Sequence, residues 1–458
     1  MTRQHTNQQD WHRTWLWFGI SVLILPMFPA MGALGLFVLS IKIWQLNYRQ
    51  IIASRLNLGL GVLAIFLIVS SVVAEQKNEA WLGLANFLPF FWLFTAVREL
   101  IGKPIQLRQL SWVLVLPSLP IVFLGYGQLF AGWDTPPWVE SIIGWGLTPY
   151  GVPPGRMSAV FIYTNFLAIY LAIAFALALG LWLDTWQAWR QKSTKHHTQV
   201  WLLLTIVLLA DISGLVLTSS RNAWGLAVIS FMAYALYIGW RWLVWGIMGG
   251  ATVILWASFA PSFGGTQLRK VVPAFFWERL SDTTYIRPVE TLRISQWQFC
   301  WDLIKQRPWF GWGLRNFSPL YEAKMNYWFG HPHSLLLMLG AEIGIIATLI
   351  LVAIVGSIMY RTSKLFIYWR DLPTIKGISE DVLKDAPANK NLARMYGITS
   401  LGDSKLIYFS YLVAFFNCIL FNLLDVTIFD LRVNTINWIL LAAINGIIIA
   451  ESNENNIS

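Results

Sequence analysis

The stretch SAVFIYTNFLAIYLAIAFALALGLWL, residues 158–183, contains no charged side chain. About 20 apolar residues suffice to cross a bilayer core as one helix, so this run predicts a transmembrane span. Comparable apolar runs lie at 15–29, 31–47, 56–74, 80–97, 109–130, 200–218, 222–240, 242–260, 333–360, 405–424 and 433–451. We therefore expect an all-α, polytopic membrane bundle of about twelve transmembrane helices.

The composition excludes an ordinary soluble protein. Apolar residues make up 56% of the chain, charged residues only 12%, and the mean hydropathy is +0.55. A soluble domain carries about twice that charged fraction. Cys300 and Cys418 fall in a loop and in a predicted span, so no disulfide or cysteine-based metal site is expected. The net charge of +10 is partly a topology signal, and no nucleic-acid motif accompanies it.

Lysine and arginine are distributed unevenly between alternate connections. With the N-terminus in the cytoplasm, the cytoplasmic segments contain Arg3, Arg13, Arg49, Arg55, Arg98, Lys103, Arg108, Arg190, Lys192, Lys195 and the cluster from Arg361 to Lys405. The opposite segments 75–79, 131–155 and 425–432 are nearly free of both residues. This asymmetry favours an even number of spans with both termini in the cytoplasm. Pro26 and Pro29 leave open a single kinked helix in place of the first two spans.

Three regions follow from this topology. Residues 1–260 form an N-terminal membrane bundle of about nine helices, and 261–332 form a large extracytoplasmic loop. Residues 333–458 form C-terminal membrane helices interrupted by a polar cytoplasmic insertion, 361–404. A loop of about 70 residues is too long for a plain connection. Its segment TLRISQWQFCWDLIKQ predicts an amphipathic helix at the membrane surface or over the bundle, which Pro308 ends.

The extracytoplasmic loop is unusually basic for that side of the membrane. Its cations are Arg269, Lys270, Arg279, Arg287, Arg293, Lys305, Arg307, Arg315 and Lys324, against five acids. An anionic partner near the outer leaflet is one explanation. The other is that loops of this length escape the positive-inside rule.

Several polar residues lie at the outer ends of the predicted spans. Arg156 precedes the span that holds Asn165, and Arg221 lies at a helix N-terminus after two serines. Backbone N–H groups and guanidinium groups at such a place suit a phosphate, although the arginines could equally snorkel to lipid headgroups. His331 and His333, where the loop re-enters the membrane, are suited to proton transfer. They could also bind a metal, but no acidic or thiol partner has a convincing spacing.

The hairpin before the last span contains Asp425, Asp430 and Arg432. Acids at the membrane edge are often functional. They are equally suited to pair with the arginines at the outer ends of the other spans.

The segments SSRNAW, RISQWQFCWDLIKQRPWFGWGLRNF, Tyr321 and HPHSLLLMLGAEIG follow one another in the order typical of a known family. With GRMSAVFIYTNFLAIYL before them and LFNLLDVTIFDLRVNTINWILLAAI after them, they resemble the O-antigen ligase family over about 150–345 and again over 415–445. Departures are Ser334, where an asparagine is common, Tyr163-Thr164 before Asn165, and Arg315 in the loop turn.

The resemblance implies a GT-C-like membrane glycosyltransferase of lipopolysaccharide or other polysaccharide biosynthesis. Such an enzyme moves a glycan from undecaprenyl diphosphate to a hydroxyl of an acceptor, for ligases the lipid A core, in the bacterial inner membrane, with inversion and without a metal or other cofactor. It assigns catalytic roles to His333, Arg221 and Arg156. Substrate contacts are expected from Arg293, Asn165, His331, Trp312 and Tyr321.

Two alternatives stay open. A polysaccharide polymerase uses the same donor with a second carrier-linked glycan as acceptor. A transporter of an anion such as bicarbonate would instead hold its substrate near the middle of the membrane. Asp211, inside a predicted span, is the main residue that supports transport.

Overall fold

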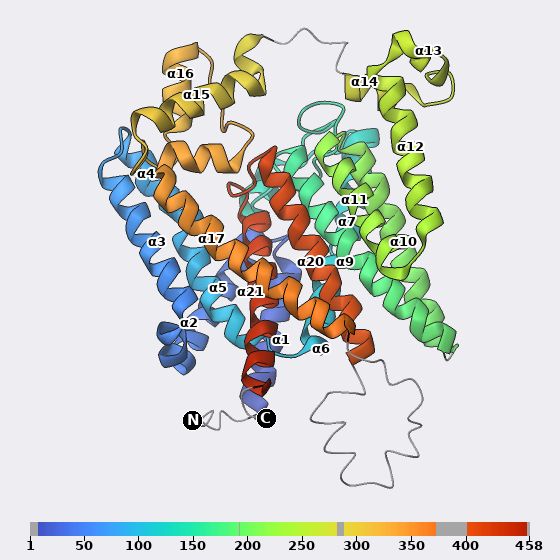
Figure 1. Ribbon diagram of the computed structural model, residues 1–458, viewed down its shortest axis with the longest axis horizontal. Helices are drawn as coiled ribbons and strands as arrows, with labels where there is room; N and C mark the ends of the chain where they lie inside the picture. Colours follow the sequence, from blue (N-terminus) through green and yellow to red (C-terminus); the bar gives the residue numbers. More distant parts are fainter. Residues whose placement is uncertain (1–7, 192, 282–287, 372–400, 456–458) are drawn as a thin grey trace.

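The computed structural model describes residues 8–191, 193–281, 288–371 and 401–455. Within these residues every regular element is a helix, and the only β-type contact is a bridge between Gly151 and Arg156. The long helices form a bundle, with shorter helices over one end (Figure 1). The elements are α1 (Gln8–Ile24), α2 (Pro29–Ala53), α3 (Arg55–Val72), α4 (Lys77–Gly83), η1 (Leu84–Asn86), α5 (Leu88–Leu100), α6 (Pro104–Val115), α7 (Ser118–Ala131), α8 (Pro137–Ile143), α9 (Thr164–Gln191), α10 (Lys195–Leu217), α11 (Arg221–Ile238), α12 (Arg241–Phe259), η2 (Pro261–Phe263), α13 (Gly265–Leu268), α14 (Ala274–Ser281), η3 (Val289–Thr291), α15 (Arg293–Gln306), α16 (Phe317–Met325), α17 (Leu335–Asp371), α20 (Leu401–Leu423) and α21 (Leu431–Asn455).

The predicted all-α membrane bundle is confirmed. Ten helical stretches of the described chain are long and apolar enough to cross a membrane. The other two predicted runs, 15–29 and 222–240, coincide with α1, which has 17 residues, and α11, which begins on the polar pair Arg221-Asn222. α1 and α2 are separate helices packed together, since a Cβ on Gly32 would lie 2.6 Å from the Cα of Leu25.

α9 is the central helix of the bundle. Its side chains from Leu167 to Leu181 are almost fully buried against α10, α11, α20 and α6. The close approach depends on small residues: a Cβ on Gly180 would meet the Ser410 hydroxyl oxygen at 1.8 Å. Because α9 begins at Thr164, next to the polar segment 150–163, the buried helix fixes the position of Asn165.

Two helical groups, together called the cap, cover the end of the bundle opposite the start of α1 and the end of α21 (Figure 1). One group, α13 and α14, packs on α12, and the other, α15 and α16, packs on α17. α15 confirms the predicted amphipathic helix; it buries Phe299, Cys300, Leu303 and Ile304. The loop between α20 and α21 lies between the two groups.

α17 is broken at Gly344, which has φ +81° and ψ 169°. The segment after α15 fills the break: Trp312 and Gly313 donate backbone N–H groups to the carbonyls of Ala341 and Glu342, at 3.0 and 2.8 Å. Ile345 in turn donates to the carbonyl of Pro308 at 2.8 Å. The cap is therefore attached to the membrane helix by backbone hydrogen bonds. Of the predicted insertion 361–404, residues 372–400 lie outside the described residues, and α17 continues to Asp371.

Candidate functional site

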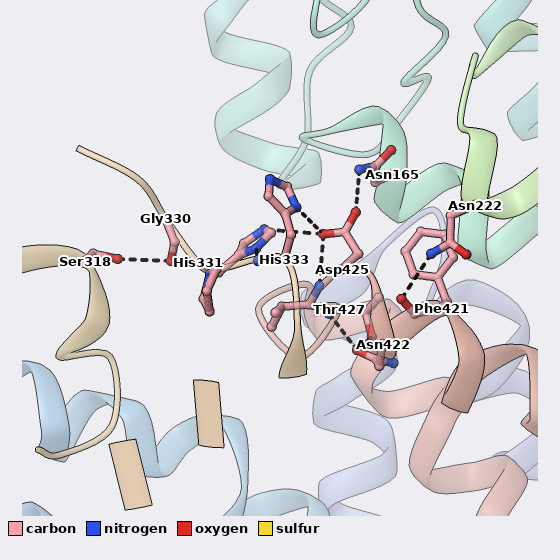
Figure 2. Close-up of polar contacts among 12 residues, drawn as sticks. Asn165, Asn222, Ser318, Gly330, His331, His333, Phe421, Asn422, Asp425 and Thr427 are labelled. Atoms are coloured by element: carbon pink, nitrogen blue, oxygen red, sulfur yellow. Dashed lines mark hydrogen bonds and ion pairs between the residues drawn. The ribbon is translucent and has the colours of Figure 1, made fainter. Parts of the chain in front are cut away.

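The site is centred on Asp425, in the loop that follows α20. Its Oδ1 atom accepts a hydrogen bond from the backbone N–H of Val426 at 2.9 Å and lies 3.2 Å from Nδ1 of His333. Nε2 of His331 lies 3.6 Å from the same oxygen. The other oxygen, Oδ2, accepts from the side-chain amide of Asn165. Figure 2 shows both imidazoles turned towards one carboxylate oxygen and Asn165 towards the other.

The hydrogen bonds assign the tautomers of both histidines. The backbone N–H of His333 donates to Nδ1 of His331 at 3.2 Å, so that nitrogen is unprotonated and Nε2 carries the hydrogen. His333 directs Nδ1 at the carboxylate, so Nδ1 carries its hydrogen and Nε2 keeps a free lone pair. No hydrogen bond among the described residues uses that Nε2 atom. His333 is thus oriented as a base, in the way that a carboxylate orients a catalytic histidine.

Burial and charge define the protonation states. Burial lowers the pKa of His331 to about 4, so this imidazole is neutral near pH 7. Burial alone would raise the pKa of Asp425, but the hydrogen bond from His333 and the electrostatic interaction with the two neighbouring imidazoles lower it below its ordinary value. Asp425 is therefore ionised and can stabilise a proton on His333.

Arg156 extends the same network. Its Nη2 atom donates to Oδ1 of Asn165 at 3.2 Å, and its Nε atom donates to the carbonyl of Thr218 at 2.8 Å. Burial lowers the pKa of this guanidinium to about 10, which leaves it charged at neutral pH. A continuous chain of contacts, Arg156–Asn165–Asp425–His333, thus joins a fixed cation to the candidate base.

These residues line a cavity of about 1140 Å³, here called the cationic cavity. Its charged lining residues are Arg156, Arg221, Arg279, Arg293, Glu278 and Asp425, which is four cations against two anions. Arg279 donates through Nε to the carbonyl of Ser219 at 3.2 Å, and Arg221 donates to the carbonyl of Arg279 at 3.3 Å.

The N-terminus of α11 opens into the cationic cavity at Ser219, Ser220 and Arg221. The Ser220 side chain makes no capping hydrogen bond, so it does not occupy the first backbone N–H groups of the helix. A helix N-terminus beside several guanidinium groups is suited to bind phosphate oxygens.

Two site residues have unusual backbone angles. His333 and Ser219 adopt φ values of +51° and +50°, which non-glycine residues rarely do. Such conformations cost about 1–3 kcal/mol each and persist only where surrounding contacts hold them. Here Asp425 holds the His333 ring, and Arg279 holds the Ser219 carbonyl.

The structure brings together most of the residues that the sequence singles out. Arg156, Asn165, Arg221, Arg293 and His333 line the cationic cavity, and His331 lines a cavity beside it. Arg287 lies outside the described residues.

Trp312 and Tyr321 lie elsewhere, among the lining residues of neither cavity. The Trp312 indole donates to the carbonyl of Leu303, and Arg307 stacks over its ring at 3.9 Å. The Tyr321 hydroxyl donates to the carbonyl of Glu290, and its ring is buried between Phe299 and Phe317. Both residues hold the cap together, because their polar atoms bind backbone carbonyls inside it.

Two site residues have no assigned role in the sequence reading. In the sequence, Arg279 is one of nine cations of the extracytoplasmic loop, and Asp425 is one of two acids in the hairpin before the last span. Asp430, the second acid, forms a buried ion pair with Arg432 at 2.9 Å. Arg432 also donates to the carbonyl of Val160, so this pair is structural. The sequence offers no signal that separates the two acids.

Within the described residues, His331, His333 and Asp425 also form the single group with three metal-ligating atoms within 4.8 Å of one another. Two imidazoles and a carboxylate could hold a divalent cation. A cation bound between Nδ1 of His333 and Asp425 would replace their hydrogen bond and leave the imidazole hydrogen on Nε2, so His333 could not act as the base.

Taken together, the fold and the site define a polytopic membrane protein with an arginine-lined cavity beside a histidine–aspartate pair. Residues 204–352 match the family model described as O-antigen ligase. This part of the chain is therefore an O-antigen ligase domain, as the motifs within it led us to expect. The matched region includes Arg221, Arg279, Arg293, His331 and His333, while Arg156, Asn165 and Asp425 lie outside it. No curated protein matches the chain.

Proposed function

We propose that this protein is a glycosyltransferase that transfers a glycan from an undecaprenyl-diphosphate carrier to an acceptor hydroxyl. The reaction would take place at the outer face of a bacterial inner membrane, with both termini in the cytoplasm. The observation that carries the proposal is the position of His333, held by Asp425 at the edge of a cavity lined by four arginines. One side of this arrangement suits a diphosphate, and the other suits a hydroxyl that must lose its proton.

In this mechanism Arg156, Arg221, Arg279 and Arg293 bind the diphosphate. They stabilise the charge that develops as the carrier leaves, which is the largest contribution expected from such a site. Nε2 of His333 accepts the proton of the acceptor hydroxyl. Asp425 stabilises the resulting imidazolium. No step requires a metal ion.

The test is complementation of a deletion strain with His333→Ala and Arg221→Ala. Each variant should abolish transfer of the carrier-linked glycan while the protein still inserts into the membrane. Arg241→Ala is the matched control, because Arg241 is exposed at the start of α12, at the end of the bundle far from the site. Full transfer by both site variants would contradict the mechanism.

The intermediates that accumulate in the deletion strain distinguish two related reactions. Long carrier-linked chains support a ligase, and single carrier-linked repeat units support a polymerase. Transport of an anion predicts instead that the purified protein in proteoliposomes takes up labelled bicarbonate. Asp211 on α10 would suit transport, since it is a carboxylate fully buried among membrane-spanning helices. It lies outside the lining of both cavities, whereas the other candidate residues gather at one end of the bundle.

A further inference from the structure

A second cavity of about 730 Å³ adjoins the cationic cavity. Tyr163, Tyr327, Phe329 and His333 line both cavities and so form a shared wall. Phe329 packs edge-on against the His333 ring with a centroid distance of 5.4 Å. A group in the second cavity therefore has access to the same imidazole as a group in the cationic cavity.

The second cavity has a different chemical character. Its aromatic lining residues are Tyr163, Phe166, Tyr327, Trp328, Phe329 and Phe429. Its charged lining residues are Glu79, Arg315 and Glu322, and Nε of Arg315 pairs with Glu79 at 2.8 Å. One cation against two anions leaves a formal charge of −1, compared with +2 for the lining of the cationic cavity. A diphosphate is therefore disfavoured here. Aromatic faces suit the apolar faces of sugar rings, and a carboxylate can accept hydrogen bonds from sugar hydroxyls.

The segment 326–332, which contributes Tyr327, Trp328 and Phe329 to this cavity, is held at several points. Asn326, with φ +53°, ends α16. The Ser318 hydroxyl donates to the carbonyl of Gly330 at 3.0 Å, and the Trp297 indole donates to the carbonyl of Pro332 at 3.0 Å. Trp328 lies between Asn326 and Gly330 and keeps 64% of its surface exposed. A rigid loop that exposes an aromatic ring is suited to bind a ligand with little loss of entropy.

On the basis of the proposed function, we propose that the second cavity binds the terminal sugar of the acceptor glycan. The bound sugar is uncharged or carries an amino group. Trp328 stacks on its apolar face and Glu322 accepts hydrogen bonds from it, so these two residues determine the specificity. The donor diphosphate occupies the cationic cavity, on the other side of the shared wall.

This arrangement fits an inverting displacement, in which the nucleophile and the leaving group lie on opposite faces of the anomeric carbon. The acceptor oxygen forms a bond to that carbon as the bond from the carbon to the diphosphate oxygen breaks. The acceptor proton passes to Nε2 of His333. The diphosphate leaves with the bonding electron pair and takes up a proton from solvent or from the imidazolium.

The test uses the full-length protein in nanodiscs with a carrier-linked glycan as donor. Two acceptors are compared, namely the lipid-free oligosaccharide released from the envelope of the deletion strain and a short carrier-linked glycan. We expect Trp328→Ala to raise the KM for the acceptor that is used about tenfold or more, which corresponds to about 1.4 kcal/mol of lost binding. The donor KM and the kcat at saturating acceptor should stay within about twofold to threefold, a range that is under 1 kcal/mol.

Trp301→Ala is the matched control, since Trp301 is also an exposed tryptophan of the cap, at 53%, and lines neither cavity. An unchanged acceptor KM in Trp328→Ala overturns the inference. So does a fall in kcat alone, because it would assign Trp328 to anchoring the loop at the lipid surface. If the wild-type protein transfers glycan to neither acceptor, the proposed function itself fails, and the two failures are thus distinguishable.

Discussion

At the scale of single residues, the contact between His333 and Asp425 carries the most chemical information. A histidine can act as a base only if one nitrogen is oriented and the other is accessible. The carboxylate supplies the orientation through Nδ1, and His331 is held neutral beside it by burial. The histidine pair thus combines a candidate base with a neutral neighbour that does not compete for the proton.

Asp425→Asn should reduce glycan transfer by about 100-fold or more, because an amide can neither fix the tautomer nor stabilise the imidazolium. Glu278→Gln is the control, since it removes a second carboxylate from the same cavity without touching His333. The measurement is the kcat of the purified variants at equal folded concentration. Similar losses in both variants would show that overall cavity charge, and not the contact with His333, determines the rate.

His331 should make the protein less stable in acid. The pKa of its imidazole is about 4 in the folded protein and 6.5 when exposed. Between these two pH values the imidazole is therefore protonated in the unfolded chain but neutral in the folded protein. Stability is then lost as the pH falls from 6.5 to about 4, with an upper limit of about 1.4 kcal/mol per pKa unit. Because 16% of the side chain remains exposed, the effect should lie below that limit.

The measurement is the Tm in detergent between pH 7.5 and 4 for wild type and His331→Gln. The variant should lose less stability than wild type across this window. Parallel curves would show that the imidazole is protonated equally easily in both states.

At the scale of elements, the break in α17 attaches the cap to the bundle. Gly344 combines a positive φ with a crowded position, since an added Cβ would lie 2.3 Å from the carbonyl oxygen of Trp309. Gly311, on the opposing segment, would place a Cβ 2.4 Å from the carbonyl oxygen of Glu342. The two glycines allow the two backbones to approach closely enough to form hydrogen bonds.

Gly344→Ala should destabilise the protein by about 1–3 kcal/mol through backbone strain, with a further cost from the clash. Gly356→Ala is the control on the same helix, where an added Cβ meets nothing within 4 Å. Thermal unfolding should show a lower Tm for the first variant and no loss for the second. Equal Tm values would mean that the break in α17 does not depend on glycine.

At the scale of the whole molecule, the site lies at the end of the bundle opposite the start of α1 and the end of α21 (Figure 1). The proposed function requires this end to face outwards. Both native cysteines are buried, so cysteines introduced at exposed positions can report the orientation.

Ser141→Cys, near the site end, should react with a membrane-impermeant thiol reagent in intact cells. Ser193→Cys, beyond the far end of α9, should react only after the membrane is opened; both positions are exposed in the structure. The measurement is labelling of each variant before and after permeabilisation. The reverse pattern would contradict the proposed orientation.

The apolar runs alone predicted the membrane bundle, because the thickness of a bilayer imposes a length and a composition that few other structures need. The ordered motifs around Arg221 and His333 likewise predicted the family. Both are local properties of the chain, and the structure and the family match bear them out.

Only the tertiary structure decided which residues form the site. Asp425 follows His333 by 92 positions and Asn165 by 260, so their contacts depend on how α9, α17 and α20 pack together. For the same reason the sequence could not separate Asp425 from Asp430, nor show that Trp312 and Tyr321 stabilise the cap. The length and apolar composition of a segment are properties of the sequence itself. The partner of a polar side chain, in contrast, is determined by distances between residues that exist only after folding.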